Sequence, residues 1–312
     1  MNKLSAVELI KQLKDKDRDR NTRAKSAEEL GNIKDKSAVR LLIKELKNED
    51  RNVRAAVVGA LGKIGEQEAI KPLREAWNED KDKHVQIEAA YALAKMGCND
   101  AFEYLIKELE NKNWVVRLNS SRALGDLGDK SAVKHLIKKL EDKHILVRFC
   151  VICALGSIND HSAVRPLIKI LCDNHWNIRR LATVSLGKIG NRLATKSLIG
   201  VLKDKDERVR NDAVWALAQL KDKSAINPLI ELLKDKNEID IVRVSVPLAL
   251  GNIGRKSVVM PLIEALEDVD ANVRFTAECA LMKMSKENFG ENPVLWERWW
   301  KRTKSSWGKK RE

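Results

Sequence analysis

The chain repeats one pattern of about 31 residues along most of its length. A Val-Arg dipeptide, or a close variant such as Ile178-Arg179 or Val85-Gln86, marks each copy. From one copy to the next the spacings are 31, 32, 31, 31, 31, 31, 33 and 31 residues, beginning at Thr22 and ending at Val273. A register held so regularly over nine copies predicts a repeat architecture rather than separately folded domains.

Each copy contains two helical patterns. In residues 37–47 apolar side chains recur at i, i+3, i+4 and i+7, which is one face of a helix. Residues 53–64 carry a second stripe of the same kind, in which alanine and glycine alternate with larger residues. The small residues indicate that neighbouring second helices approach closely.

The helix ends are also encoded. Three residues before each Val-Arg valine, six of the nine copies have Asp or Asn, whose side-chain oxygens accept hydrogen bonds from the first amides of a helix. Glycine follows most second helices, where a left-handed residue is needed, at Gly65, Gly97, Gly128, Gly190 and Gly254. Proline falls in the first turn of four first helices, where it is tolerated, at Pro72, Pro166, Pro228 and Pro261.

One such helix pair is too small to bury its own apolar face, but stacked pairs share a continuous core. We therefore expect an all-α fold, a right-handed α-solenoid of about nine two-helix repeats. Residues 1–285 would form the solenoid as a single domain. Residues 286–312 would form a capping helix and a basic tail, because Trp296, Trp299 and Trp300 lie on one helical face.

The repeat pattern resembles the HEAT-like repeat of the phycobilisome-lyase type. The likeness covers roughly residues 4–285 and is closest at residues 54–65 and 162–171. In proteins of this kind the second helices line the concave surface, and the Val-Arg arginine pairs with an acidic residue of the neighbouring loop. The resemblance implies the fold and leaves the activity open, because the same repeat occurs in scaffolds and in bilin lyases.

The outward positions of the second helices carry more large side chains than solubility requires. Aromatic and apolar residues with interleaved arginine are typical of a binding surface. The alternative is that these side chains pack on one another across the repeats. The predicted partner-binding residues are Tyr91, Trp114, Leu118, Arg122, Phe149, Trp176, Arg180, Trp215 and Phe275.

The net charge of +14 suggests an acidic partner, but the outward positions of the second helices do not carry it. Those positions hold nearly equal numbers of basic and acidic residues, whereas a groove that follows nucleic acid should be strongly basic. We therefore expect most of the excess lysine on loops, the convex side and the tail. Nucleic-acid binding remains the second alternative.

No catalytic constellation or metal site stands out. Cys150, Cys153, Cys172 and His175 have a zinc-like spacing, but the repeat register places them on different elements of adjacent repeats, so we expect no metal and no cofactor. Two enzymatic alternatives stay open. One is a bilin-lyase-like activity, and the other is a glycosylase-like activity, for which Asp212 and Trp215 would be the place to look.

Composition limits the location. No run of about 18 apolar residues is present and the first residues lack the apolar core of a secretory signal, so we expect neither a membrane span nor export. Five cysteines without a regular framework fit a reducing compartment. The sequence thus favours a non-catalytic cytoplasmic scaffold that binds a protein or peptide of unknown identity.

Overall fold

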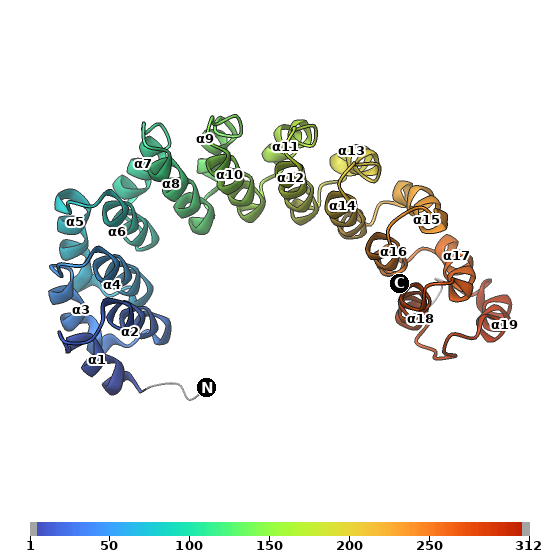
Figure 1. Cartoon of the computed structure of the whole chain (residues 1–312), viewed down its shortest axis with the longest axis horizontal. Helices are drawn as coiled ribbons and strands as arrows, with labels where there is room; N and C mark the ends of the chain where they lie inside the picture. Colours follow the sequence, from blue (N-terminus) through green and yellow to red (C-terminus); the bar gives the residue numbers. More distant parts are fainter. Residues whose placement is uncertain (1–4, 308–312) are drawn as a thin grey trace. The chain divides into compact units, whose positions relative to one another are not determined.

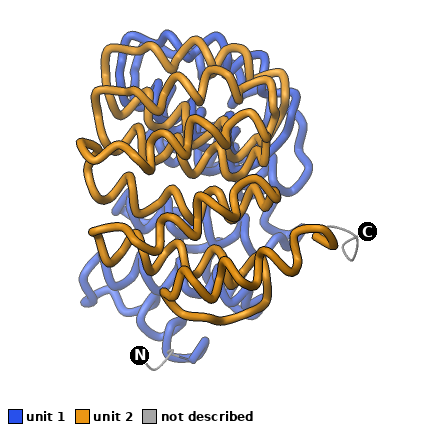
Figure 2. Tube along the Cα trace, turned by 90° about the vertical axis from the view of Figure 1, so that its right-hand side faces the viewer, with its two compact units in different colours: residues 1–158 blue, residues 159–312 orange. Residues whose placement is uncertain are grey.

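The computed structural model describes residues 5–307, and all regular structure in that range is helical. The chain, whose helices are labelled in Figure 1, divides into two compact units, residues 1–158 and 159–312 (Figure 2). Within each unit, helix pairs stack one on the next, as the repeat period predicts. The last residues of the predicted basic tail, 308–312, lie outside the described range. In the described part of the chain, no helix is long and apolar enough to cross a membrane.

Unit 1 contains five helix pairs. Its first helices are α1 (Ala6–Lys14), α3 (Val39–Glu45), α5 (Ile70–Glu79), α7 (Asn99–Glu108) and α9 (Val133–Ile137). Its second helices are longer on average and pack on one another in sequence: α2 (Arg20–Ile33), α4 (Arg51–Ile64), α6 (Lys83–Lys95), α8 (Trp114–Leu127) and α10 (Ile145–Ile158).

Unit 2 contains four helix pairs and a terminal helix. Its first helices are α11 (Val164–Ile170), α13 (Thr195–Val201), α15 (Ile226–Lys234) and α17 (Val259–Glu264). Its second helices are α12 (Trp176–Ile189), α14 (Glu207–Leu220), α16 (Asp240–Ile253) and α18 (Ala271–Ser285), and α19 (Pro293–Thr303) follows them. The expected eighteen repeat helices and one terminal element are thus confirmed.

Most first helices begin with a separate 3₁₀ turn, which the periodicity did not predict. Residues 37–47, expected to be one helix, are divided between η1 (Lys36–Ala38) and α3. The equivalent turns are η2 (Gln67–Ala69), η3 (Lys130–Ala132), η4 (His161–Ala163), η5 (Arg192–Ala194), η6 (Lys223–Ala225) and η7 (Lys256–Val258). An acidic or amide side chain caps five of the seven turns: at η1, Asp35 accepts a hydrogen bond from the Ser37 amide at 2.8 Å, whereas η2 and η7 have no side-chain cap.

The predicted helix caps are confirmed. Asp50 accepts hydrogen bonds from the amides of Asn52 and Val53 at 2.8 and 3.2 Å, and it thereby caps α4. At the other end of α4, Gly65 has a φ of 77°, a left-handed conformation that favours glycine. Ile239, the apolar residue at the start of α16, makes no side-chain cap, as its chemistry requires.

Glycine and alanine set the spacing between consecutive second helices. A Cβ added to Gly62 of α4 would lie 2.6 Å from the Cβ of Ala92 of α6. No real side chain fits at that distance, so the two helices can pack this closely only because residue 62 is glycine. The same glycine–alanine contact recurs at Gly31–Ala60, Gly125–Ala154, Gly187–Ala216 and Gly251–Ala280.

The predicted arginine ladder is confirmed. Arg54 donates from Nε and Nη2 to the two carboxylate oxygens of Asp80, at 2.7 and 3.0 Å, and both side chains are almost fully buried. Nη1 of the same guanidinium donates to the carbonyl oxygens of Asn48 and Glu49. One arginine therefore joins its own repeat to the next through four hydrogen bonds. Equivalent pairs are Arg117–Asp142, Arg179–Asp204, Arg210–Glu238 and Arg243–Asp268.

In one loop the position of the ladder aspartate is occupied by an asparagine, Asn48. A glutamate three residues earlier then supplies the negative charge that pairs with the arginine. Arg23 pairs with Glu45 at 2.8 Å, and Asn48 donates a hydrogen bond to the same carboxylate. From the loop sequence alone, Arg23 would lack a carboxylate partner. Glu45, one helical turn earlier, supplies that carboxylate.

The third repeat has Gln86 at the position of the ladder arginine. Its cation is instead Lys83, three residues earlier. Lys83 lies 2.9 Å from Glu108 and also donates to the hydroxyl of Tyr104 at 2.6 Å. Gln86 keeps the backbone contact of the missing arginine by donating to the carbonyl oxygen of Asp80 at 2.8 Å. Asn111 donates to Glu108 and completes the network. This junction therefore retains a cation and an anion, each displaced by three residues.

The tryptophan-rich segment forms α19, which follows the last repeat. Trp296, Trp299 and Trp300 of α19 are 0%, 6% and 7% exposed, and α19 packs on α17 of the last repeat. The indole nitrogen of Trp296 donates to the carbonyl oxygen of Gly290 at 2.8 Å, which satisfies the polar atom of a fully buried ring. Trp307 packs edge-on against Trp299 and Trp300.

Substituting two glycines of the same helix tests the close helix contact. We expect Gly62→Ala to lower the thermal unfolding midpoint, because overpacking at this contact costs about 1–3 kcal/mol. Gly59→Ala is the matched control, since no atom lies within 4 Å of the added Cβ. That substitution should raise the midpoint, because alanine in a helix gains about 0.5–1 kcal/mol over glycine. Circular dichroism would measure both, and equal effects of the two substitutions would contradict the packing argument.

The ladder predicts a dependence of stability on pH at Asp268. Burial opposes ionisation of this carboxyl, but hydrogen bonds from Lys236, the Asp270 amide and Arg243 outweigh it and lower its pKa from 3.8 to about 2. The carboxylate therefore stabilises the fold above about pH 4, and the contribution is lost as the pH falls towards 2. We expect Asp268→Asn to lose about 2 kcal/mol at neutral pH and to approach wild type near pH 2.

Unfolding followed by circular dichroism at several pH values would measure this effect. Glu267→Gln is the control, because Glu267 is an exposed carboxylate in the same turn. A difference between wild type and Asp268→Asn that stays constant down to pH 2 would show that the charge of Asp268 is not what stabilises the junction.

Candidate functional site

The second helices of each unit form one layer, and the first helices form the other (Figure 1). The second-helix face of a unit is the surface of its second helices that points away from the first helices. The Val-Arg residues of each second helix, such as Val53 and Arg54, are buried. The second-helix face is therefore formed by other residues of the same helices. All nine predicted partner-binding residues lie on second helices, five in unit 1 and four in unit 2.

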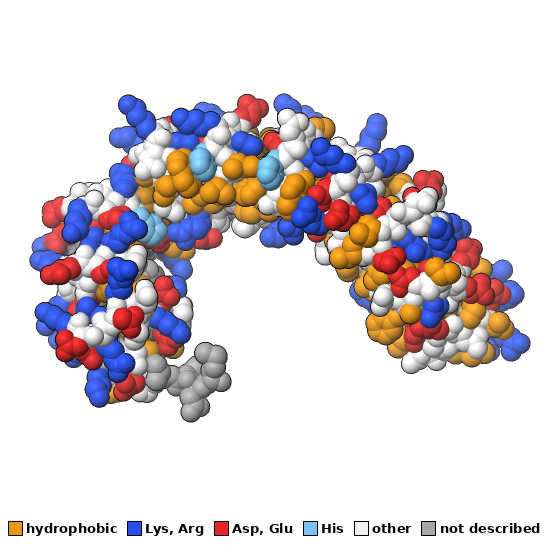
Figure 3. Space-filling view, viewed as in Figure 1, with side chains coloured by type: hydrophobic (Ala, Val, Ile, Leu, Met, Phe, Trp, Pro, Cys, Tyr) orange, Lys and Arg blue, Asp and Glu red, His pale blue; other side chains and the backbone are white. Residues whose placement is uncertain are grey.

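In unit 1 an apolar patch lies on α8 and α10. Trp114, Val115 and Leu146 are 36%, 39% and 41% exposed, and Leu118 and Phe149 are half-buried beside them. The space-filling view shows hydrophobic side chains gathered over these two helices (Figure 3). Cys150 is close enough to the backbone of Leu118 to donate to its carbonyl oxygen at 3.4 Å, so the two helices meet directly under the patch.

Trp114 is partly covered by the next repeat. Its ring stacks on the imidazole of His144 with a centroid distance of 3.8 Å and an interplanar angle of 6°. Trp114 is the first residue of α8, and His144 directly precedes α10. The alternative of self-packing is therefore correct for one face of this indole, while about a third of the side chain stays accessible to solvent.

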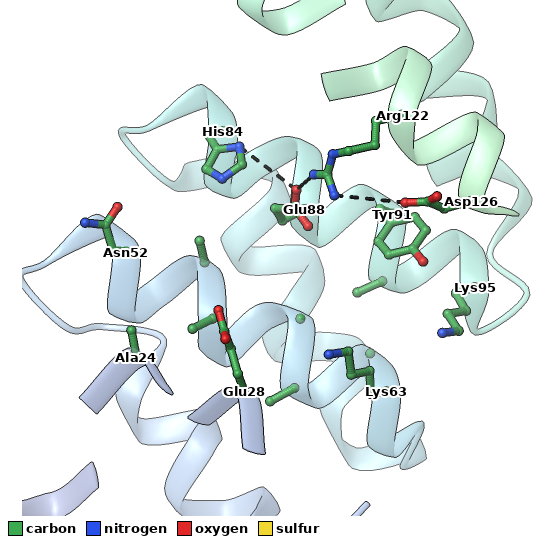
Figure 4. Close-up of a pocket in the computed structure, with 16 residues that line it drawn as sticks. Ala24, Glu28, Asn52, Lys63, His84, Glu88, Tyr91, Lys95, Arg122 and Asp126 are labelled. Atoms are coloured by element: carbon green, nitrogen blue, oxygen red, sulfur yellow. Dashed lines mark hydrogen bonds and ion pairs between the residues drawn. The ribbon is translucent and has the colours of Figure 1, made fainter. Parts of the chain in front are cut away.

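Next to the patch, a cavity of about 520 Å³ opens between α2, α4, α6 and α8 (Figure 4). The cavity is lined by small residues of α4, because α4 carries Ala56 and Gly59 where the other second helices of unit 1 have larger residues. Its wall includes Tyr91 and Arg122, two of the predicted residues. The structure thus brings these two together, one repeat apart.

Charged side chains of both signs line this cavity. Arg122 forms an ion pair with Glu88 across the seam between α6 and α8, and Asp126 lies 4.0 Å from the same guanidinium. His84 lies 4.0 Å from Glu88 (Figure 4). Burial raises the pKa of Tyr91, and the nearby carboxylates of Asp126 and Glu88 raise it further. Tyr91 therefore remains a neutral hydroxyl that can donate or accept a hydrogen bond.

In unit 2, Trp176 and Arg180 make contacts across the seam between α12 and α14. The guanidinium of Arg208 lies over the indole of Trp176, 3.5 Å from the ring centroid, which is a cation–π contact. Arg180 donates to Asp212 at 2.8 Å. Burial raises the pKa of Asp212 in spite of this hydrogen bond. Both predicted residues are thus engaged within the fold as well as facing outward.

Trp215 and Phe275, the other predicted residues of unit 2, are 37% and 59% exposed. They lie on α14 and α18, on either side of α16. The outward residues of α16, which the sequence prediction omitted, are also apolar: Ile241 is 59% exposed, and Val244 and Leu248 are half-buried. Counting the outward positions from Val242-Arg243, as in the other repeats, identifies these three residues in the sequence.

The cysteines and histidines do not come together as a metal site. Among the described residues, no group of three or more His, Cys, Asp or Glu side chains could hold a metal ion. Burial, together with the neighbouring Cys153, raises the pKa of the Cys150 thiol to about 12. Cys150 is therefore protonated at neutral pH and is a poor nucleophile.

Two solved structures resemble the chain along most of its length. YibA from Escherichia coli is 22% identical, with a TM-score of 0.58, over 88% of this chain and 99% of that one. Kap95p, in a structure of its complex with RanGDP, is 15% identical, with a TM-score of 0.55, over 88% of this chain and 44% of that one. At these identities the likeness concerns the fold alone.

A weaker likeness is to the complex of CpcE and CpcF of phycocyanin lyase from Nostoc sp. PCC7120, with 20% identity and a TM-score of 0.44 over 79% of this chain and 94% of that one. A search of curated proteins gave no match. The model of the PBS lyase HEAT-like repeat matches residues 85–111. The model of HEAT repeats matches residues 6–94, 102–176 and 164–246, which is well over half of the sequence, and the chain therefore belongs to the HEAT repeat family.

Proposed function

We propose that the chain is a non-catalytic scaffold that binds a protein or peptide partner through its second-helix faces. Residues 1–285 would supply the binding faces, and residues 286–312 would close the end of the repeat array. The observation that carries the proposal is the set of large apolar side chains left exposed on these faces. The most exposed of them are Trp114, Val115 and Leu146 in unit 1 and Trp215, Ile241 and Phe275 in unit 2.

These side chains are costly to leave in water. Covering an apolar surface gains roughly 25 cal/mol per Å², so several exposed rings and branched chains on one face supply much of the energy of a moderate complex. Solubility alone would place lysine or glutamate at such positions. Tryptophan is among the residue types that most often dominate the energy of protein interfaces, and phenylalanine is enriched in them.

The charges of the second-helix faces favour a partner with mixed chemistry over a polyanion. Arg122 and Arg180, the two predicted arginines, are each held by a carboxylate of the adjacent second helix. Binding a phosphate backbone there would require breaking these pairs. A peptide can instead place an apolar side chain over the small residues of α4 and meet the charged rim with its own polar groups.

The fold is suited to this role. Kap95p, which shares the fold, is seen bound to a folded protein, RanGDP. Residues 85–111 match the PBS lyase HEAT-like repeat. An alternative function is therefore that of a bilin-lyase-like protein. A bound tetrapyrrole would give the purified protein a visible absorbance band, whereas the proposed scaffold gains no such band when bilin is added.

Selection from a phage-displayed peptide library tests the proposal. We expect peptides selected on wild type to bind at least tenfold more weakly when the matching face is truncated, since losing one anchor costs about 2 kcal/mol. Trp114→Ala with Leu146→Ala truncates the face of unit 1, and Trp215→Ala with Phe275→Ala truncates that of unit 2. Isothermal titration with synthetic peptides would measure the affinities.

The matched control is Val7→Ala with Met260→Ala. Both residues are exposed and apolar but lie on first helices, α1 and α17. We expect this control to bind as wild type does. Peptides that bind both truncated variants with unchanged affinity, or a library that yields no binder, would refute the proposal.

A further inference from the structure

Half of the chain's net charge is concentrated in one short stretch of unit 2. Residues 161–203 contain eight Lys and Arg and a single acidic residue, Asp173, a net charge of +7 out of the +14 of all 312 residues. Two of the eight are already engaged, because Arg179 pairs with Asp204 and Arg180 pairs with Asp212. The other six have no such role in the fold.

All six side chains are exposed, and five of them define a basic face on the first-helix layer of unit 2. These five lie on α11, on η5, on α13 and just after α13: Arg165, Lys169, Arg192, Lys196 and Lys203. The sixth, Lys188, lies at the end of the second helix α12 and is not part of this face. Figure 3 shows Lys and Arg side chains projecting from the first-helix side of unit 2 in the region of α11 and α13. This surface is separate from the second-helix faces.

The basic face differs from other parts of the first-helix layer in containing few acidic residues. Elsewhere several cations of this layer pair with acids of the adjacent repeat, as in Lys36–Glu66 at 2.6 Å, Lys139–Glu110 at 2.5 Å and Lys234–Glu264 at 2.9 Å. None of the six has a carboxylate oxygen within 4.0 Å among residues 5–307, and the nearest electrostatic influence is that of Arg192 on Asp222, whose pKa it helps to lower. A surface that served only solubility would mix charges as the other repeats do.

The repeat places these cations in a regular array. Arg165 and Lys169 are four residues apart on α11, about 6 Å along the helix axis. Arg192 and Lys196 have the same spacing across η5 and the start of α13. Arg165 and Lys196 occupy equivalent positions 31 residues apart, and α11 packs on η5, so the two rows lie roughly 8–10 Å from each other.

We propose that this basic face binds the sugar–phosphate backbone of a nucleic-acid strand, independently of sequence. A chain of phosphates is the polyanion whose closely spaced charges match an array of unpaired Lys and Arg. The contact releases counterions, and each neutralised phosphate adds about −0.7 to the slope of log K against log salt for a single strand. Four or five contacts give a slope of roughly −3 to −4.

An anionic membrane fits this face less well. Membrane-surface helices combine basic residues with several large apolar side chains that enter the lipid. Within residues 161–203, Leu193 is the one large apolar side chain that is exposed, at 64%. Electrostatics alone would give about 1 kcal/mol per basic residue at a lipid surface, which is weak and needs a second anchor.

Fluorescence anisotropy with a labelled oligo(dT) or oligo(U) of about 20 nucleotides tests the proposal, since this length exceeds the usual site size. We expect wild type to bind with micromolar affinity at low salt and with the slope given above. The variant Arg165→Glu, Lys169→Glu, Arg192→Glu, Lys196→Glu should bind at least tenfold more weakly, with a slope reduced by about 3. The four residues are exposed, so circular dichroism should show an unchanged fold.

The control makes the same change in net charge elsewhere on the first-helix layer. It converts four exposed lysines, one on each of four helices of unit 1, to glutamate: Lys11, Lys44, Lys71 and Lys107. We expect the control to keep most of the affinity and the slope. Equal losses in both variants would show an effect of net charge and would overturn the proposal. So would absence of binding at low salt, or tighter binding to phosphatidylserine vesicles than to either oligonucleotide.

Because the basic face lies on first helices, its test is separable from that of the proposed function. Loss of peptide binding in the truncated second-helix variants would leave oligonucleotide binding unchanged. Loss of oligonucleotide binding in the charge-reversed variant would leave peptide binding unchanged. Failure of one proposal therefore does not imply failure of the other.

Discussion

The buried pairing of an arginine with a carboxylate of the following repeat is the interaction on which the rest of the structure depends. A guanidinium such as that of Arg117 is removed from water and would be costly there without Asp142 and the two carbonyl oxygens that also accept from it. The pair forms only when the loop of one repeat reaches the second helix of the repeat before it. It therefore fixes the register of stacking, whereas apolar contacts alone would permit sliding.

The register of stacking also explains the two kinds of surface. Small residues such as Gly62 and Ala92 bring second helices close together, so the side chains on that face meet across each seam and pair or stack there. Trp114 on His144 and Trp176 under Arg208 are examples. The first-helix layer is more open, and its long charged side chains reach water. The exposed aromatic rings of the repeats thus lie on the second-helix layer.

The fold could be predicted almost completely because it repeats. A pattern that recurs nine times averages out local ambiguity, so the number of helices and the caps followed from spacing, whereas the arginine ladder followed from the resemblance to HEAT-like repeats. The 3₁₀ turns at the start of first helices were missed because a capped turn such as that at Asp35 and Ser37 has the same apolar pattern as a helix. The compensations at Glu45 and Lys83 were missed because they depend on which side chains meet in space.

The candidate site was less predictable. Register identified which residues face outward, and Trp215 and Phe275 are indeed exposed. It could not tell that Trp114 and Trp176 would be partly covered by a neighbour, since stacking depends on side-chain rotamers. The cavity beside Tyr91 depends on the absence of large side chains at residues 56 and 59 of α4. The sequence prediction looked for aromatic and charged residues, so it did not identify a cavity lined by small ones.

The altered junction at Lys83, Gln86 and Glu108 shows that the contact between repeats does not depend on one residue type. Glu108 and Asn111 occupy the same repeat positions as Glu45 and Asn48, and Glu45 pairs with a ladder arginine. Lys83 reaches its carboxylate from one helical turn before the usual position, and its side chain stays 39% exposed. A junction can therefore replace a buried guanidinium with a partly hydrated ammonium and keep its ion pair.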